Sequence, residues 1–332
     1  MMQFSLIICT YMRPIAIVKL LQSVKEQTVY PNEILIIDGS TNDETNRALK
    51  NEVFNNLSYY KVGETDRGLT KQRNFGVKKV NERSNIICFL DDDTVLSSNY
   101  FEELMKSYSQ YPNAIGIGGY INNEVNWEVI QEIEDNKNIY SIDGFYRSEG
   151  IRFRLRKYFG LIDGTPPGFM PPYSHGRSIS YLPPSGKIYP VEFFMGGVSS
   201  FKKNLLEKIK FSTYFEGYGL YEDLDFCLRA SKLGQLYVNT NALLEHHHDE
   251  EGRPNKYSYG KMVVRNGWYV WNVKYPNPDA KSSIQFYLNV FALASIRFIN
   301  SFYGNNKKQA LTETLGRLSG LISLIFNKPV KE

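Results

Sequence analysis

Continuous apolar runs alternate with amphipathic segments along the first 120 residues. The apolar runs at residues 3–9, 33–38 and 86–90 are typical of buried strands, and shorter stretches at 57–62 and 114–119 add two more. Segments of helical character lie between them, at 14–27, from about 43, at 68–80 and at 99–108. Strands that alternate with such helices predict an α/β fold, in which helices cover both faces of a mostly parallel sheet.

This rhythm stops between about residues 122 and 189, where six prolines interrupt any regular element: Pro166, Pro167, Pro171, Pro172, Pro183 and Pro184. Such a stretch is typical of a long functional loop rather than of a packed layer. Regular structure is expected to resume at 191–195, with helices from about 202 and over 221–233. From residue 255 onward the pattern is helical.

Three consecutive aspartates, Asp91, Asp92 and Asp93, follow the apolar run at 86–90. They place several negative charges at one point of a sheet edge. Like carboxylates this close cannot all stay ionised unless a cation balances them, and hard oxygen ligands suit Mg²⁺ or Mn²⁺. The tripeptide by itself is equally compatible with a solvated loop or with the start of a helix, where Asp is also favoured.

The composition is that of a globular protein of one large or two modest domains, with 332 residues of which 42% are hydrophobic. Three cysteines without framework spacing, and an N-terminus without a signal-peptide pattern, predict reduced thiols and a cytoplasmic location. The net charge of +4 is concentrated toward the C-terminus, since residues 281–332 hold seven Lys or Arg and two Glu. This distribution argues against a general nucleic-acid-binding protein and indicates one face suited to an anionic surface.

Two common nucleotide-binding motifs are absent from the sequence. There is no Gly-x-x-x-x-Gly-Lys phosphate loop, and the glycine-rich segment 116–119 lacks the third glycine of a dinucleotide fingerprint. Instead, six segments resemble in order the motifs of family-2 glycosyltransferases: SLIICTYMRP at 5–14, LIIDGSTND at 35–43, DRGLTKQRNFGV at 66–77, FLDDDTVLSSNY at 89–100, FFMGGVSSFKK at 193–203 and GLYEDLDFCLRASKLG at 219–234. The resemblance spans about residues 4–248 apart from the proline-rich stretch, and it implies the GT-A fold of nucleotide-diphospho-sugar transferases.

The resemblance implies a donor site at the ends of the first strands. Thr10 and Tyr11 would hold the nucleotide base and ribose, and Asp38 would accept a hydrogen bond from the base ring. Arg73 would contact the base or the diphosphate. From the residues alone, Asp38 is also compatible with a plain turn residue, and Arg73 with a solvated helix face.

The resemblance also implies a divalent metal, Mn²⁺ or Mg²⁺, on the strand-terminal acids. Asp93 would be a ligand, while Asp91 or Asp92 would share the metal or reach the donor ribose. A histidine after a strand in the second half would be the third ligand, and its position favours His246 over His248. In an extended segment these two rings would point the same way. A surface histidine cluster without a metal is the alternative.

An inverting transferase needs one base that removes the proton of the acceptor hydroxyl while its oxygen attacks the anomeric carbon. The resemblance places that base at Asp223, beside Glu222 and Asp225 at the start of a helix. Carboxylates in a first helical turn also serve as ordinary dipole stabilisers. Gly196 and Gly197 would let the backbone approach the donor or the acceptor closely, and a tight turn is their alternative.

The resemblance divides the chain into a GT-A catalytic domain at 1–254 and a C-terminal helical region at 255–332. Within the first, residues 1–120 would be the nucleotide-binding half, 121–190 an insertion over the active face, and 191–254 the acceptor and catalytic half.

The C-terminal region holds an apolar stretch, residues 283–303, which Asn289, Arg297 and Asn300 interrupt, so it is expected to fall short of a membrane span. This stretch and the basic-aromatic segment 151–161 are expected to contact the inner face of the cell membrane peripherally. The alternative is that the C-terminal helices pack on the catalytic domain or form a homodimer.

The resemblance thus implies an inverting, metal-dependent glycosyltransferase. Its donor would be a nucleotide-diphosphate sugar, with a UDP-sugar expected, and its acceptor a saccharide or a lipid-linked saccharide in surface polysaccharide or glycolipid synthesis. Two alternatives remain open. A nucleotidyltransferase that makes the sugar nucleotide would carry a glycine-rich basic loop at residues 10–14, which is absent here. A non-catalytic nucleotide-sugar-binding module would not need the acidic pair Glu222 and Asp223.

Overall fold

A computed structural model describes residues 2–130, 139–174, 176–215, 217–247, 254–303 and 306–330. The chain divides into two compact units. The first consists of residues 1–126 and 182–252, and the second of residues 127–181 and 253–332. The proline-rich stretch therefore contributes to both units, and each unit is described by itself.

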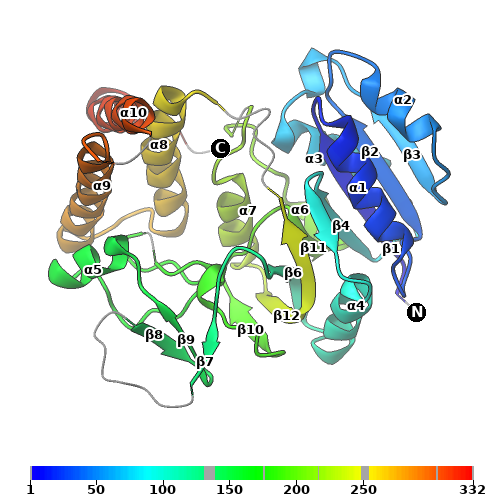
Figure 1. The fold of residues 1–332 in the computed structure, drawn as a ribbon, viewed down its shortest axis with the longest axis horizontal. Helices are drawn as coiled ribbons and strands as arrows, with labels where there is room; N and C mark the ends of the chain where they lie inside the picture. Colours follow the sequence, from blue (N-terminus) through cyan, green and yellow to red (C-terminus); the bar gives the residue numbers. More distant parts are fainter. Residues whose placement is uncertain are drawn as a thin grey trace. The chain divides into compact units, whose positions relative to one another are not determined.

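The first unit is an α/β layer structure around a nine-stranded sheet (Figure 1). Its strands are β1 (Phe4–Thr10), β2 (Glu33–Asp38), β3 (Leu57–Lys61), β4 (Ile86–Asp91), β5 (Thr94–Leu96), β6 (Ala114–Ile121), β10 (Ile188–Val191), β11 (Val198–Lys202) and β12 (Gln235–His246). Its helices are α1 (Pro14–Lys25), α2 (Glu44–Lys50), α3 (Leu69–Lys79), α4 (Tyr100–Gln110), α6 (Lys203–Lys208) and α7 (Glu222–Ala230), with a 3-10 turn at Glu64–Asp66.

The strand order is β10-β12-β6-β11-β4-β1-β2-β3, and β5 pairs with β12 outside this path. Strands β1 to β4 are parallel to one another, while β11 runs antiparallel to both of its neighbours, β4 and β6. Strand β12 is parallel to β6. Six strands (β1, β2, β3, β4, β6 and β12) therefore share one direction, as the sequence pattern predicted for a mostly parallel sheet.

Helices cover both faces of this sheet, because its central strands are apolar on both sides. Leu6 and Ile8 of β1 belong to the same buried cluster as the inner faces of α1 and α4. Ile7, which points the other way, meets α3 at Gly76, where an added Cβ would lie 2.8 Å from the isoleucine side chain. Glycine is therefore required for the close approach of α3 to the sheet.

Two features of the chain differ from the sequence-based expectation. The apolar run at 191–195 is not a strand, because β10 ends at Val191 and β11 begins only at Val198. Phe194 is apolar for another reason: it is buried against β6, where an added Cβ on Gly118 would lie 2.8 Å from its ring. The proline-rich stretch also contains regular elements that the sequence pattern did not indicate.

These elements belong to the second unit, which combines a small antiparallel sheet with long helices (Figure 1). The sheet has the order β7-β9-β8. The elements of the second unit are β7 (Glu128–Val129), β8 (Ile139–Ile142), β9 (Phe145–Ser148), α5 (Ile151–Tyr158), α8 (Lys256–Lys274), α9 (Ala280–Asn300) and α10 (Lys307–Phe326), with a 3-10 turn at Ile179–Tyr181. An arginine–aromatic contact joins β9 to the 3-10 turn, since the Arg147 guanidinium lies 4.3 Å from the centre of the Tyr181 ring.

Small residues and one buried ion cluster join the long helices. Gly260 of α8 and Gly316 of α10 each face the backbone of the other helix so closely that no Cβ fits between them. Glu313 of α10 accepts hydrogen bonds from Arg317 at 2.7 and 3.0 Å and from Arg297 of α9 at 2.9 Å. Burial alone would raise the pKa of Glu313, but the two guanidinium groups outweigh it and lower the pKa.

Candidate functional site

Three parallel strands bring the predicted acids to the same sheet edge. In the register of the sheet, Thr10 pairs with Asp38 on β2, and Cys9 pairs with Asp91 on β4. The carboxyl ends of parallel strands meet at one edge, where ligands bind in open α/β sheets. The expectation that these strand ends are neighbours is therefore met.

The second half of the chain reaches this edge through β12. Strand β12 pairs with the short strand β5 so that His246 lies opposite Thr94, the residue after the acidic tripeptide. The His246 Nε2 atom consequently lies 3.1 Å from Asp93 Oδ1, and its Nδ1 lies 3.0 Å from Glu124 Oε1. Burial alone would lower the pKa of His246, but the hydrogen bonds to Asp93 and Glu124 outweigh it and raise the pKa to about 10.

Asp91, Asp93 and His246 each offer a ligand atom, and these atoms all lie within 4.8 Å of one another. Two carboxylates and one imidazole form a donor set that suits Mn²⁺, because such a mixed oxygen and nitrogen site accepts this ion well. The residues present therefore fit the divalent metal that the sequence implied. His247 is directed elsewhere, since its ring lies 3.2 Å from Glu245, and His248 lies outside the described residues.

Asp92 has a different environment from its two neighbours. It is buried and accepts a hydrogen bond of 2.6 Å from the Thr10 hydroxyl. Arg13 contacts Asp92 at 2.9 Å and Asp93 at 3.3 Å. Burial raises the pKa of Asp92 to about 7, against the opposing effects of Arg13 and Thr10. Thr10 and Asp92 thus bind each other at the sheet edge. Their contacts with the nucleotide stay a prediction.

The sequence analysis did not identify Arg13, which binds Asp92 and Asp93, or Glu124, which binds His246. Arg13 stood in the matched segment at 5–14, but its position next to Pro14 gave no sign that it would reach the aspartates. Glu124 lies just after β6 and is brought to His246 only by the β6–β12 pairing. No local pattern in the sequence could have indicated that contact.

The predicted base-binding residues lie at the ends of β1 and β2, since Asp38 is the last residue of β2 and Tyr11 follows the last residue of β1. Asp38 is completely buried, and its oxygens accept hydrogen bonds of 2.7 Å from the Tyr59 hydroxyl and the Ser40 backbone amide. Tyr11, by contrast, is 39% exposed, and its contact with a nucleotide also stays a prediction. Asp38 therefore holds the turn after β2 through Ser40 and Tyr59. Its contact with a nucleotide base stays a prediction.

Arg73 is a buried arginine in the middle of the site rather than a solvated helix residue. Its guanidinium binds Glu222 and lies 3.4 Å from Asp91. The rings of Phe89 and Phe211 flank it at 5.7 and 5.3 Å. Burial alone would lower the pKa of Arg73, but the charges of Glu222 and Asp91 outweigh it and raise the pKa. Arg73 thus links the acid at the end of β4 with the acids at the start of α7.

The three acids of the first turn of α7 have different partners. Asp225 is buried and binds Arg229 at 2.6 Å, while Glu222 is buried and binds Arg73. Among the described residues, Asp223 accepts hydrogen bonds from backbone amides, those of Gly196 at 3.2 Å and Leu224 at 2.7 Å. Burial raises the pKa of Asp223 and also that of Glu222, the latter to about 8, so both carboxylates are stronger bases than usual. Because Glu222 and Asp225 are each bound to an arginine, Asp223 is the acid of this group that is best suited to proton transfer.

The backbone at Gly196 and Gly197 joins Asp223 to the cluster of Asp91, Asp93 and His246. Gly196 donates to Asp223, and the carbonyl of Gly197 accepts from the backbone amide of Asp91 at 3.0 Å. An added Cβ on Gly197 would overlap the Asp91 carboxylate, and one on Gly196 would lie 2.5 Å from the Arg73 guanidinium. The two glycines therefore let α7 and β4 present their acids side by side.

Replacing Gly197 with alanine should displace the Asp91 carboxylate and weaken metal-dependent nucleotide binding at least about tenfold, the loss typical of a misplaced metal ligand. Gly63→Ala is the matched control, because nothing lies within 4 Å of an added Cβ at Gly63. Calorimetric titration of UDP with and without Mn²⁺ measures the effect. Equal affinities for the two variants would contradict this account of Gly197.

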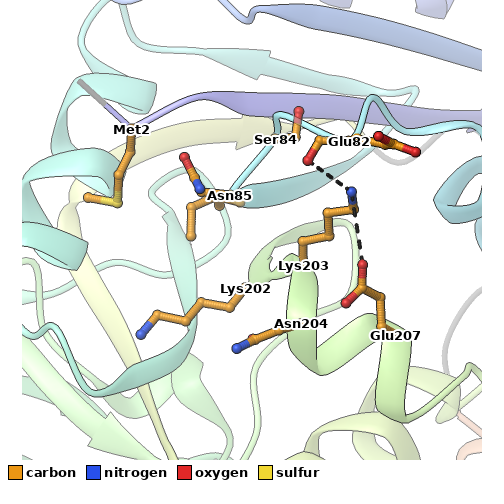
Figure 2. A pocket seen from close by; sticks show the side chains of 9 residues that line it. Met2, Glu82, Ser84, Asn85, Lys202, Lys203, Asn204 and Glu207 are labelled. Atoms are coloured by element: carbon orange, nitrogen blue, oxygen red, sulfur yellow. Dashed lines mark hydrogen bonds and ion pairs between the residues drawn. The ribbon is translucent and has the colours of Figure 1, made fainter.

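A separate pocket of about 670 Å³ opens at the other end of β4 (Figure 2). Its lining residues are Met2, Glu82, Ser84, Asn85, Ile86, Lys202, Lys203, Asn204 and Glu207. Lys203 Nζ already donates to the backbone carbonyls of Asn81 and Glu82. The pocket holds none of the predicted site residues, since Ile86 and Asp91 are the opposite ends of the same strand.

Comparisons with known proteins agree with this architecture. The sequence model of glycosyl transferase family 2 matches residues 5–174. The O-antigen chain rhamnosyltransferase RfbN of Salmonella typhimurium is 30% identical over 98 residues, which are 30% of this chain and 30% of that protein. This chain thus matches less than a third of the length of that relative.

Two solved structures share the fold. The mannosyltransferase PcManGT from Pyrobaculum calidifontis, in complex with GDP-Man and Mn²⁺, superposes with a TM-score of 0.56 at 14% identity, covering 98% of this chain and 88% of that one. The S. aureus protein TarS 1–349, in complex with UDP-GlcNAc, gives 0.55 at 15% identity, covering 99% and 82%. At these identities the likeness concerns the fold, which is the GT-A fold expected from the sequence. With its family model matched over about half of its length, the chain belongs to glycosyl transferase family 2.

Proposed function

We propose that this protein transfers a sugar from a nucleotide-diphosphate donor to an acceptor hydroxyl, with a divalent metal and with inversion at the anomeric carbon. One observation carries the proposal. The ligand atoms of Asp91, Asp93 and His246 converge at the sheet edge, and Gly196-Gly197 links this cluster to the Asp223 carboxylate. A metal site beside a basic carboxylate is what metal-dependent inverting transfer requires.

In this proposal Asp91, Asp93 and His246 hold Mn²⁺ or Mg²⁺. The ion, when bound, neutralises negative charge on the donor diphosphate and so favours the departure of the nucleotide. Arg13 and Arg73 keep the three aspartates and Glu222 in place beneath the site. The exposed ring of Tyr11, just after β1, contacts the base or ribose of the donor.

Asp223 takes the proton of the acceptor hydroxyl. A bond forms between the acceptor oxygen and the anomeric carbon as the bond from that carbon to the nucleotide diphosphate breaks. Because attack comes from the face opposite the leaving group, the anomeric configuration inverts. The raised pKa of Asp223 supports this role, since a carboxylate of ordinary pKa accepts a proton less readily near neutral pH.

The relatives support the proposed donor and acceptor classes. The fold neighbours were solved with GDP-Man and with UDP-GlcNAc, which supports a nucleotide-diphosphate sugar, and we take a UDP-sugar as the first candidate. The relative named as an O-antigen chain rhamnosyltransferase supports an acceptor in surface polysaccharide synthesis, either a saccharide or a lipid-linked saccharide. Such a reaction would take place on the cytoplasmic side of the cell membrane.

Thermal unfolding with a panel of nucleotide sugars tests the proposal. A cognate donor at about 100 times its dissociation constant should stabilise the protein by about 2.7 kcal/mol, and only with Mn²⁺ or Mg²⁺ present. The stabilising donor is then assayed for transfer to saccharide acceptors. Stabilisation without any transfer would indicate a binding module, and pyrophosphate release from a nucleoside triphosphate and a sugar phosphate would indicate a nucleotidyltransferase.

A further inference from the structure

Helices α9 and α10 each carry a stripe of exposed apolar side chains. In α10 these residues recur with alternating spacings of four and three, and in α9 with spacings of four, three, seven and four, which places them on one side of each helix. The stripe residues are Ile284, Leu288, Phe291, Phe298 and Phe302 in and just after α9, and Leu311, Leu315, Leu318, Ile322 and Ile325 in α10. Side chains such as Phe291 and Leu315 are 58% and 51% exposed, although they sit in the middle of their helices. We call these two sets the apolar stripes.

The opposite side of each helix is bound inside the second unit. Phe286 of α9 stacks on Trp271 of α8 with ring centres 4.3 Å apart, and Asn289 accepts a hydrogen bond from Arg156 of α5 at 3.0 Å. Arg297 binds Glu313 between α9 and α10. The apolar stripes are therefore what remains after the unit has formed its own core, and exposed apolar side chains that gather in this way are typical of an interaction site.

The charges around the apolar stripes select one kind of partner. Between residues 280 and 330 the sole acidic residue is Glu313, which is buried between two arginines. The exposed charged residues at the helix ends are four lysines, Lys281, Lys307, Lys308 and Lys328, and one acid, Asp279, at the start of α9. A symmetric second copy would present the same mostly basic surface, because an isologous interface pairs the same surface with itself. An anionic lipid surface complements both the lysines and the apolar side chains.

We propose that the apolar stripes of α9 and α10 dock this protein peripherally on an anionic membrane surface. By length and composition α9 is able to cross a membrane, contrary to the sequence-based expectation for this stretch. Its inward contacts favour a position on the surface instead. A span would require α9 to leave Trp271, Arg156 and Glu313, and to place Asn289 and Arg297 among lipid tails without these partners.

Vesicle co-sedimentation of the full-length protein tests the proposal, without nucleotide, metal or acceptor. It therefore does not depend on the proposed transferase activity. The protein should bind vesicles of mixed phosphatidylglycerol and phosphatidylcholine, and bind less at high salt because salt screens surface charge. Phe291→Glu with Leu315→Glu should weaken binding at least about tenfold, since two apolar side chains no longer enter the lipid. Lys307→Gln and Lys308→Gln should each weaken it about fivefold.

Val53→Glu is the matched control, because Val53 is an apolar side chain that is 79% exposed in the first unit. It should bind vesicles as the unmodified protein does. All substituted side chains are exposed, and unchanged thermal unfolding of each variant verifies the fold. The proposal is overturned if the unmodified protein ignores anionic vesicles at low salt, or if Phe291→Glu with Leu315→Glu binds them undiminished. A stable dimer that this double variant converts to monomer would also overturn it, because a second copy would then cover the apolar stripes.

Discussion

Asp223→Asn should lower the rate of sugar transfer at least about 100-fold, the lower range for loss of a general base, while nucleotide and metal bind nearly as before. The amide keeps the size of the carboxylate but cannot accept the acceptor's proton. Glu222 and Asp225 cannot easily replace it, because each is buried in an ion pair with an arginine. The expected signature is therefore a fall in kcat without a matching change in the dissociation constant of the donor.

The measurement combines steady-state transfer rates with calorimetric titration of the donor nucleotide. Asp279→Asn is a matched control, since Asp279 caps α9 through a hydrogen bond from the Ser282 amide, and Asn caps a helix as well as Asp does. Loss of donor binding in Asp223→Asn would make Asp223 a donor-holding or structural residue. Near-normal turnover would place the base elsewhere. Retention of the anomeric configuration in the product would refute single-base inversion.

Asp93→Ala should abolish metal-dependent nucleotide binding and, with it, sugar transfer. Asp93 lies at the centre of the cluster, in contact with His246 on one side and Arg13 on the other. Its removal takes away a ligand atom and leaves Arg13 and His246 with one partner fewer. Binding of nucleotide without the metal should change much less, so the benefit that Mn²⁺ gives to nucleotide affinity is the quantity to compare.

His246→Ala should show a milder form of the same defect, whereas His247→Ala should leave the effect of Mn²⁺ intact. The two rings are adjacent in sequence, but only His246 approaches Asp93, while His247 lies 3.2 Å from Glu245. Calorimetry with and without Mn²⁺ on the three variants distinguishes ligand loss from general damage to the loop. If Asp93→Ala retains its metal-dependent affinity, the metal site is elsewhere. A larger loss in His247→Ala than in His246→Ala would contradict the observed orientation of the rings.

The layer structure of the first unit could be predicted because its signals are local. Residues 34–37 and 86–90 are apolar at every position, which is the pattern of a strand buried on both faces, and each run is followed by an aspartate. The strands observed there, Glu33–Asp38 and Ile86–Asp91, match those runs within a residue. The run at 191–195 misled, because short apolar segments look alike whether they pair as strands or only fill the core.

The sequence alone therefore determined the fold class, the family motifs and the acids that gather at one sheet edge, since hydrophobic periodicity and strand-end residues are readable within a few neighbouring positions. The tertiary structure alone decided which groups meet. It paired β12 with β5 to bring His246 to Asp93, buried Arg73 between Asp91 and Glu222, and left Asp223 with backbone partners. Those contacts join residues far apart in the chain, and their energies depend on strand register and burial, neither of which any local pattern encodes.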